Sequence, residues 1–395
     1  MKLPKGWDLA AMNSLGSVQA GRQRSPHHVA GELRPYLRVA NVQDGWIDYR
    51  DVKEMAFTSK EAAIYELRQG DILLSEGQSL ELVGRPAIYR GGIPRCCFQN
   101  TLVRLRPDGH EPDFVFYVCQ YLYGLGVFQR IAKKTTSIAH LGVSRFAEVT
   151  APIPPLPEQR KIADILTTWD EALTQLDALI DAQERRKKAL MQQLLTGRRR
   201  LPGFSKPWES SKFGQFLTES RTEGSDGVTA RKITVKLYGR GVLAKQDRMA
   251  GSANTKYFVR RSGQLIYSKL DFLNGAFGII PPELNGYEST LDLPSFDVKP
   301  NADVRWLLAY LVRPEFYEKQ VGAAAGGRIA RRVNPPEFLK LRIKAPELAE
   351  QRAIAAILDT AEQQLTLLRD QRIALDQQKR GLMQLLLTGK LRVTA

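Results

Sequence analysis

The sequence has few of the residues that form disulfide frameworks or metal sites. It contains three cysteines, Cys96, Cys97 and Cys119, and four histidines among 395 residues. Three clustered thiols are too few for a disulfide framework, and adjacent cysteines lack metal-ligand spacing, so we expect small buried side chains in a reducing compartment. His27 and His28 have no cysteine or acidic partner at ligand spacing, which favours a solvated loop and predicts no metal site.

Long hydrophobic runs are missing too. No stretch of about 18 apolar residues occurs, which argues against a membrane-spanning helix, and the first residues have no apolar segment of signal-peptide length. We therefore expect a cytoplasmic protein. With 43% hydrophobic and 25% charged residues, the composition is that of ordinary globular domains, and the length favours two to four of them.

Catalytic motifs are absent as well. The closest match to the [ND]-P-P-[FYW] loop of an adenine methyltransferase is NPPEF at residues 334–338, where Glu337 replaces the aromatic ring that would stack on a flipped base. The glycine-rich residues 322–328 lack the Gly-Lys-Ser/Thr ending of a phosphate loop. We predict that the chain is not an enzyme by itself and binds no cofactor.

Basic residues exceed acidic ones, and the formal net charge is +16. Residues 1–155 carry 19 basic and 15 acidic side chains, a net charge of +4, whereas residues 201–345 carry 23 and 14, a net charge of +9. The two remaining segments, 156–200 and 346–395, are nearly neutral. This distribution favours a polyanionic partner for the two globular regions.

One long stretch occurs twice. Residues 158–197 align with residues 350–389 at an offset of 192 without a gap, and 20 of the 40 aligned positions are identical. Each copy predicts a helix of about 60 Å at 1.5 Å per residue, entered through prolines and ended by Gly197 or Gly389.

Both copies carry a heptad seam with steps of four and three residues. The seams are apolar at their ends and polar around Gln183, Lys187, Arg372 and Lys379, and we expect the two helices to pair antiparallel. Ala361 occupies a further seam position. The apolar seam residues are Ile162, Leu166, Trp169, Leu173, Leu176, Ile180, Leu190 and Leu194 in the first copy, and Ile354, Leu358, Leu365, Leu368, Leu375, Leu382 and Leu386 in the second.

The globular regions predict an α+β fold. Strands are expected at 36–42, 71–75 and 101–105, followed by a helical segment at 113–131. The second region repeats the first more faintly: GQLIYS at 263–268 matches GDILLS at 70–75. The chain therefore divides into globular regions at 1–155 and 201–345 and helical spacers at 156–200 and 346–395.

Together these stretches resemble the specificity (S) subunit of type I restriction–modification systems. The resemblance rests on PLPEQRKIADIL to LLTG (154–197), its copy EQRAIAAIL to LLTGK (350–390), YLRVANVQDGWID (36–48) and GDILLSEG (70–77). It implies two tandem α/β target-recognition domains separated by an antiparallel coiled coil in a pseudo-twofold repeat. Each domain would read one half of a bipartite DNA site. The resemblance also implies two methyltransferase (M) subunits, which would bind S-adenosylmethionine and methylate adenine, and two restriction (R) subunits.

Three segments of each globular region are candidates for contact with double-stranded DNA. Arginine, asparagine and glutamine suit base edges, whereas lysine, threonine and serine suit phosphates. In the first region the candidates are Arg38, Asn41, Gln43, Arg85, Arg90, Arg95, Lys133, Lys134, Thr135, Thr136, Ser137, His140 and Arg145. In the second they are Lys236, Tyr238, Arg240, Lys269, Asn274, Arg328, Arg331, Arg332 and Asn334. A solvated basic surface is the alternative interpretation of all of them.

Two other functions stay open from the sequence. One is a coiled-coil scaffold whose globular domains bind proteins, although the basic excess in the globular regions weighs against it. The other is a self-sufficient methyltransferase or nuclease, which the absent motifs disfavour. For a DNA reader, the helices would set the unread spacer, because reading modules commonly lie about 34–36 Å apart or at multiples of that distance.

Overall fold

The computed structural model describes residues 3–24, 30–135, 137–246, 251–317 and 332–393. The chain forms two compact units. Unit 1 comprises residues 1–178 and 370–395, and unit 2 comprises residues 179–369. Each unit contains one globular region and part of both long helices. The division of the chain into four segments by the internal repeat stays a prediction.

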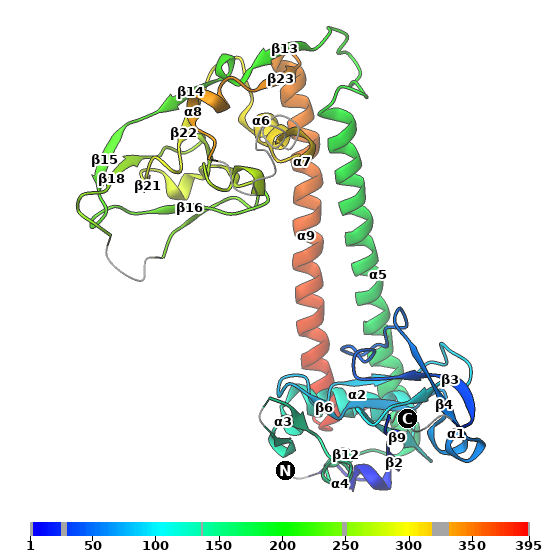
Figure 1. The fold of residues 1–395 in the computed structure, drawn as a ribbon. Coiled ribbons are helices and arrows are strands. Elements are labelled where there is room, and N and C mark those ends of the chain that lie inside the picture. The colour runs from blue at the N-terminus through cyan, green and yellow to red at the C-terminus, as the bar shows by residue number, and fades with distance from the viewer. Residues whose placement is uncertain (1–2, 25–29, 136, 247–250, 318–331, 394–395) are drawn as a thin grey trace. The chain divides into compact units, whose positions relative to one another are not determined.

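The two long helices are confirmed (Figure 1). Helix α5 spans Leu156–Leu194 and α9 spans Leu348–Leu387. Each carries a glutamate in its first turn, Glu158 or Glu350, where a negative charge suits the positive end of the helix dipole. Behind each helix a glycine adopts positive φ, 69° at Gly197 and 68° at Gly389, which is the conformation that commonly ends a helix.

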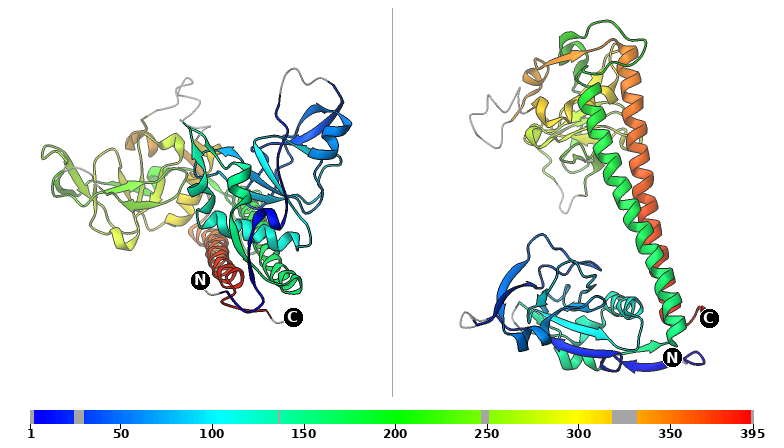
Figure 2. Two further views of the ribbon diagram at one scale, coloured as in Figure 1. Left: turned by 90° about the horizontal axis from the view of Figure 1, so that it is seen from below. Right: turned by 90° about the vertical axis from the view of Figure 1, so that its right-hand side faces the viewer.

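Helices α5 and α9 lie side by side and run antiparallel (Figure 2), as the seams predicted. In unit 1, Lys379 Nζ donates to Asp170 Oδ1 at 2.5 Å, and Arg372 Nε donates to Asp177 Oδ1 at 3.1 Å. The α5 residue moves later in the chain, from Asp170 to Asp177, while its α9 partner moves earlier, from Lys379 to Arg372. This order is that of an antiparallel pair. The pairs in unit 2 continue this order: Glu184 with Arg369, and Lys187 with Glu362.

All seam residues are buried or half-buried. Ile162, Leu166 and Leu386 belong to the main core of unit 1, and Ile354 and Leu358 belong to that of unit 2. Burying a side chain of this size stabilises a fold by about 1.5–3 kcal/mol. The ends of the long helices are therefore part of the globular cores, which fixes each globular region to its helix pair.

Unit 1 combines short helices with four small sheets. The sheet orders are β2-β9-β5-β7, β4-β3-β8, β10-β11-β6 and β1-β12. The strands are β1 (Asp8–Ala11), β2 (Gly16–Ala20), β3 (Glu32–Leu37), β4 (Lys53–Phe57), β5 (Ile72–Ser75), β6 (Gly77–Gln78), β7 (Pro86–Ile88), β8 (Cys97–Phe98), β9 (Leu102–Pro107), β10 (Lys133–Lys134), β11 (Ala139–His140) and β12 (Thr150–Ile153). The short helices are η1 (Met12–Ser14), α1 (Ser59–Tyr65), α2 (Pro112–Gly124), α3 (Val127–Ile131) and α4 (Val143–Ala147).

Unit 2 repeats two of these sheets. The order β14-β22-β19-β20 corresponds to β2-β9-β5-β7, and β13-β23 corresponds to β1-β12; β15-β18-β21 and β16-β17 complete the unit. The strands are β13 (Glu209–Lys212), β14 (Leu217–Ser220), β15 (Glu223–Asp226), β16 (Ile233–Val235), β17 (Val242–Ala244), β18 (Lys256–Val259), β19 (Leu265–Tyr267), β20 (Phe277–Ile279), β21 (Glu288–Ser289), β22 (Ser295–Val298) and β23 (Arg342–Ala345). The helices are η2 (Phe213–Gln215), η3 (Phe272–Asn274), η4 (Pro282–Leu284), α6 (Val304–Leu311), α7 (Pro314–Tyr317) and α8 (Pro335–Phe338).

The strands predicted at 71–75 and 101–105 are confirmed as β5 and β9, but the strand predicted at 36–42 is wrong beyond Leu37. There β3 ends and the chain turns. The Asn41 side chain accepts the Arg38 amide proton and donates to the Asp48 and Asp51 carbonyls, at 2.9 and 3.0 Å for the two donated bonds. Such bonds from side chain to backbone compete with strand pairing and outweigh the alternating pattern.

The helical segment predicted at 113–131 is confirmed, with one interruption. Helix α2 ends at Gly124 and α3 begins at Val127, and Gly126 between them has φ of 70°. This left-handed conformation suits glycine and breaks the helix. Helix α2 buries Phe114, Phe116 and Tyr117 in the core of unit 1.

Candidate nucleic-acid interface

Unit 2 brings its three candidate segments together. The turn between β16 and β17 carries Lys236, Tyr238 and Arg240, all exposed. Its Tyr238 amide donates to the Asn274 carbonyl at 2.9 Å, which joins it to the segment after β19. That segment is joined to the third, because the Val333 amide donates to the Lys269 carbonyl at 3.1 Å. Backbone hydrogen bonds therefore unite segments that are far apart in sequence.

The Tyr238 turn is rigid and presents its ring to solvent. Tyr238 has φ of 59° and is 68% exposed. A left-handed backbone costs a residue other than glycine about 1–3 kcal/mol. The turn is held by the Tyr238 bond and by a second one, from the Gly239 amide to the Gly275 carbonyl at 2.8 Å. A strained, well-supported turn that exposes an aromatic ring is typical of a contact surface.

Further cations lie on the two segments that are joined to this turn. Arg332 pairs with Asp292 at 2.7 Å, and both side chains are about half exposed. Burial lowers the pKa of Lys269, although Asp292 opposes that effect. Asn334 is exposed at the start of α8. The predicted contacts Arg328 and Arg331 lie outside the described residues, as do the glycine-rich residues 322–328.

In unit 1, β10 and β11 form a small sheet with β6, which directly follows the GDILLS strand. Lys133, Lys134, Thr135 and Ser137 are exposed on this sheet and its turn. His140 Nδ1 lies 3.1 Å from Glu76 Oε2, and Arg145 Nη2 donates to the His140 carbonyl at 2.7 Å. Thr136 lies outside the described residues, as do His27 and His28.

The turn after β3 joins a second candidate segment of unit 1. Arg85 donates to the Val42 carbonyl, and Gln43 Nε2 donates to the Ala40 carbonyl at 3.0 Å. Arg38 pairs with Asp51 at 2.5 Å. Asn41 is 2% exposed and its amide group is occupied by backbone partners. Because the Asn41 side chain is buried and bonds the backbone of its own turn, it stabilises the turn and is not among the proposed DNA contacts.

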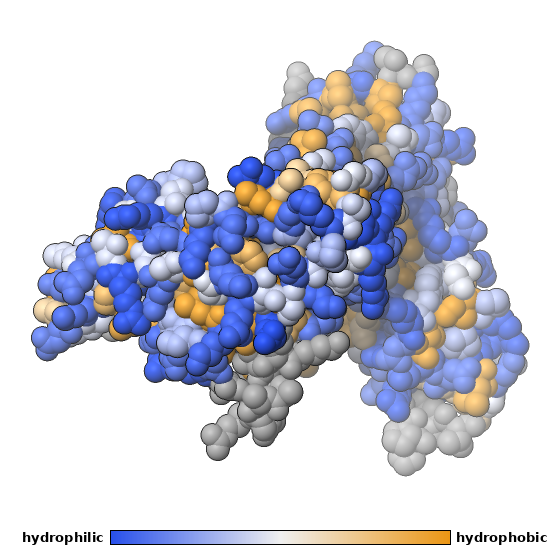
Figure 3. Space-filling view, turned by 90° about the horizontal axis from the view of Figure 1, so that it is seen from above, coloured by the Kyte–Doolittle hydropathy of each residue, from blue (hydrophilic) through white to orange (hydrophobic). Residues whose placement is uncertain are grey.

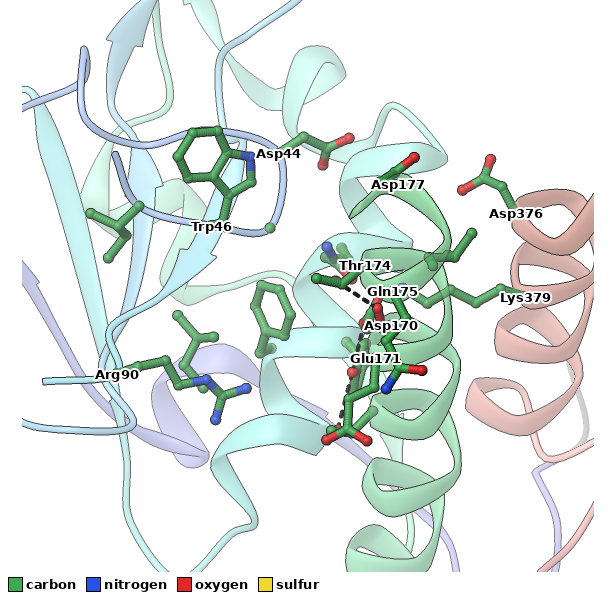
Figure 4. A pocket seen from close by; sticks show the side chains of 18 of the residues that line it. Asp44, Trp46, Arg90, Asp170, Glu171, Thr174, Gln175, Asp177, Asp376 and Lys379 are labelled. Atoms are coloured by element: carbon green, nitrogen blue, oxygen red, sulfur yellow. Dashed lines mark hydrogen bonds and ion pairs between the residues drawn. The ribbon is translucent and has the colours of Figure 1, made fainter. Parts of the chain in front are cut away.

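Arg90 and Arg95 each pair with an acidic side chain. Arg95 forms an ion pair with Glu32, and Arg90 donates to Asp113 at 3.0 Å. Arg90 also lines a cavity of about 780 Å³ together with side chains of α5 and α9 (Figure 4). The first candidate segment of unit 1 is therefore divided: Arg85 bonds to the turn after β3, Arg90 lines the same cavity as Trp46 of that turn, and Arg95 is paired with Glu32.

That cavity is mainly acidic. Asp44, Asp170, Glu171, Asp177 and Asp376 line it. Its cations and aromatic groups are Arg90, Arg372, Lys379, Trp46, Tyr49, Phe116 and Tyr117. Burial raises the pKa of Tyr117, whose hydroxyl donates to Asp170 Oδ2 at 2.8 Å. Its lining of five carboxylates against three cations does not suit phosphate contact.

Sequence reasoning missed Trp46. It is 54% exposed on the turn after β3 and lines the acidic cavity. A tryptophan directly after the turn-forming pair Asp44-Gly45 is the signal that could have found it. Tyr238 is likewise exposed on a turn, close in sequence to Lys236 and Arg240.

The structure also explains the Glu-Gln pair that opens each repeated helix. Glu158 accepts bonds from Trp7 Nε1 at 3.0 Å and from Arg392 Nε and Nη2 at 2.7 and 2.9 Å. Burial tends to raise the pKa of Glu158, but Arg392 and Trp7 outweigh it and the pKa is lowered. Unit 2 repeats the arrangement: Glu350 accepts from Trp208 Nε1 at 3.1 Å and from Arg200 Nε and Nη2, both at 2.8 Å.

The glutamines tie each globular region to its long helix. Gln159 Oε1 accepts the Glu111 amide proton at 3.0 Å, at the start of α2. Gln351 Oε1 accepts the Asp303 amide proton at 3.0 Å, at the start of α6. Both glutamines are at most 2% exposed. The repeated pair therefore fixes how each region leaves its helix.

Known proteins are similar to this chain in sequence. Residues 4–183 match the family described as "Type I restriction modification DNA specificity domain". The chain is 22% identical to the "Putative type I restriction enzyme MjaX specificity subunit" of Methanocaldococcus jannaschii, over 99% of this chain and 95% of that one. It is 24% identical to the "Type I restriction enzyme MjaVIII specificity subunit" of the same organism, over 100% and 95%.

Solved structures share the fold. The HsdS subunit from Thermoanaerobacter tengcongensis matches with a TM-score of 0.52 at 18% identity, over 99% of both chains. The S subunit from M. genitalium matches with a TM-score of 0.58 at 15% identity, over 100% of this chain and 99% of that one. Residues 4–183 thus match the model of that specificity-domain family, and the whole chain is similar to specificity subunits of type I restriction–modification systems, in line with the resemblance noted in the sequence.

No helix in the described part of the chain combines the length and the apolar character needed to cross a bilayer.

Proposed function

We propose that the chain reads a bipartite, asymmetric DNA site, with one half-site for each globular region. The observation that carries this proposal is the convergence in unit 2 of three basic or polar segments around the rigid Tyr238 turn. Arg240 and Arg332 would bond base edges, and Lys236 and Lys269 would hold phosphates. In unit 1 the corresponding surface comprises Arg38, Gln43, Lys133, Lys134, Thr135 and Ser137.

The chain takes part in no bond-making of its own in this proposal. The NPPEF segment supports this, because Phe338 is fully buried and stacks on Phe213 with ring centroids 5.0 Å apart. A ring held in the core cannot stack on a flipped base. Two M subunits would bind S-adenosylmethionine and methylate adenine, and two R subunits would cleave. This chain would bind no cofactor and would act in the cytoplasm.

The paired helices would set the length of the unread spacer. Each has about 40 residues and so extends about 60 Å. Inserting one heptad into both helices would add about 10 Å. We expect the spacer to grow by about three base pairs or binding to be lost, because the reading modules rotate along the groove. An unchanged spacer would contradict the proposal that the helices set its length.

A methylome of cells carrying this chain and its M subunit tests the proposal. We expect one bipartite adenine motif. Replacing residues 201–345 with the corresponding region of another specificity subunit should change one half-site and leave the other intact. Purified chain with S-adenosylmethionine and DNA should transfer no methyl group. Transfer by the chain alone would overturn the non-catalytic role.

A protein-binding scaffold is the second candidate. The face drawn in Figure 3 is mainly hydrophilic, with apolar side chains in small separate patches. Such a face offers no broad apolar surface of the kind that favours stable protein docking. A gel-shift assay with a library of DNA sites and the M subunit present separates the two, because a scaffold would show no sequence preference.

A further inference from the structure

The four ion pairs between α5 and α9 are of two kinds. In the outer pairs, Asp170 with Lys379 and Lys187 with Glu362, each helix contributes one acid and one base. Lys187 and Lys379 are equivalent at the offset of 192, and so are Asp170 and Glu362. The outer pairs would therefore form equally well if one α5 helix paired with a second α5 helix.

The inner pairs are polarised. Helix α5 contributes Asp177 and Glu184, and α9 contributes Arg372 and Arg369. Asp177 and Arg369 occupy equivalent positions of the repeat, 192 residues apart, with opposite charge. All four side chains are between 39% and 53% exposed. The middle of α5 is therefore acidic where the middle of α9 is basic.

The repeat shows what pairing between like helices would do. Glu184 faces Arg369, whose equivalent on α5 is Asp177. Two α5 helices in the same register would therefore place Glu184 of each copy beside Asp177 of the other. Two α9 helices would place Arg372 of each copy beside Arg369 of the other, although Asp376 would come within reach of Arg369. Facing like charges disfavour such contacts.

The apolar ends of the seam cannot make this choice. Ile162 and Leu166 have Ile354 and Leu358 at the equivalent positions, and Leu194 has Leu386. Two copies of the chain could thus exchange helices and keep most of the buried contacts. We propose that the inner ion pairs select the partner: they commit α5 to an α9 helix and disfavour pairing of α5 with α5, or of α9 with α9, between two copies of the chain.

A charge exchange isolates this role. Glu184→Arg/Arg369→Glu keeps the Asp177–Arg372 pair and also the pair between positions 184 and 369, with its signs reversed. It makes the contact between two α5 helices attractive, because position 184 of one copy would then oppose Asp177 of the other. The matched control, Asp177→Arg/Glu184→Arg/Arg369→Glu/Arg372→Glu, reverses all four charges and keeps the polarity.

The measurement uses the full chain in two differently tagged forms, unfolded and refolded together. Light scattering after size exclusion gives the dimer fraction, and co-purification of both tags reports exchange. Exposed pairs change such equilibria by up to about fivefold each. We expect the dimer fraction of the exchanged variant to be about ten times that of the wild-type chain. The wild-type chain and the control should stay mainly monomeric.

Three comparisons keep the test decisive. Mixing the two tagged forms after folding should give no mixed dimer, since exchange requires unfolding. Thermal melts should show that the exchanged variant is as stable as the control, because both keep all four cross-helix pairs. An exchanged variant no more dimeric than wild type would overturn the proposal. A control that dimerises as much as the exchanged variant would overturn it as well.

Discussion

Glu158→Gln tests whether the ion pair at the start of α5 holds unit 1 together. The substitution keeps the size of the side chain but removes the negative charge that accepts two bonds from Arg392 and one from Trp7. Glu158 is 5% exposed, whereas the Arg392 side chain is 40% exposed and can be solvated after the change. Hydrogen bonds to charged groups contribute about 1.5–3 kcal/mol each.

We expect a loss of about 2 kcal/mol in the free energy of unfolding of unit 1. This loss is far below the sum of the three hydrogen-bond contributions, because water solvates the exposed part of Arg392 after the change and the glutamine keeps one acceptor oxygen. For a unit of this size, about 2 kcal/mol lowers the melting temperature by about 4–8 °C. Near-ultraviolet circular dichroism of the full chain during heating measures it, because Trp7 lies against the substituted group.

The pH dependence gives a second measurement. The pKa of Glu158 is lowered in the folded chain from its ordinary value of 4.5. A lowered pKa means that the folded state favours the ionised form, so this stabilisation is complete above pH 4.5 and is lost as the pH falls through the folded pKa. The difference between wild type and Glu158→Gln should therefore shrink below pH 4.5.

Two matched substitutions frame the result. Glu350→Gln removes the equivalent charge in unit 2 and should cost a similar amount, since Arg200 and Trp208 donate to it in the same way. Glu171→Gln removes an exposed charge from the same helix as Glu158 and should change stability by less than about 0.5 kcal/mol. If Glu158→Gln melted like Glu171→Gln, the anchoring role would be refuted.

Three more sets of substitutions test the candidate DNA contacts and the core of unit 2. Tyr238→Ala should weaken specific DNA binding by about 1–3 kcal/mol through the loss of a contact with a base edge, and a gel shift with unchanged affinity would contradict a DNA contact. Phe338→Ala should destabilise unit 2 by about 3–5 kcal/mol, because the ring is fully buried; calorimetry measures this, and a smaller loss would mean that the ring is not part of the core. Because residues 201–345 carry the larger net charge, +9 against +4 for residues 1–155, Lys236→Gln with Lys269→Gln should flatten the slope of log affinity against log salt by about one per lost phosphate contact and by more than Lys133→Gln with Lys134→Gln, and the reverse order would refute a larger phosphate contribution from unit 2.

The long helices and several strands could be predicted from sequence, because their signals are local. A heptad pattern, a first-turn glutamate and a closing glycine all lie within the helix that they specify. The short apolar run at 72–75 similarly marks β5. The turn at Asn41 could not be predicted by alternation alone, because its bonds reach Asp48 and Asp51 and replace the pairing that the pattern favours.

The candidate surface could be predicted only in pieces. Each piece was recognisable by residue type, but the contact between the Tyr238 turn and Asn274 joins residues 36 positions apart in sequence. Residue type also failed to separate Arg85, which supports a turn, from Arg90, which lines an acidic cavity beside the helices. Both distinctions depend on tertiary contacts, which a single sequence does not specify.

Comparing equivalent positions shows where the two units must agree and where they can differ. Glu158 and Glu350, with the glutamine after each, make the same contacts in both units. The exposed turns differ: Trp46 lies after β3 and lines the acidic cavity, whereas Tyr238 lies between β16 and β17 with Lys236 and Arg240. If both units made the same contact, their exposed turns would be under the same constraint as the glutamates. Because the helix anchors are identical and the exposed turns diverge, we infer that the anchors serve a shared geometry and the turns serve separate contacts, as the proposed reader of two different half-sites requires.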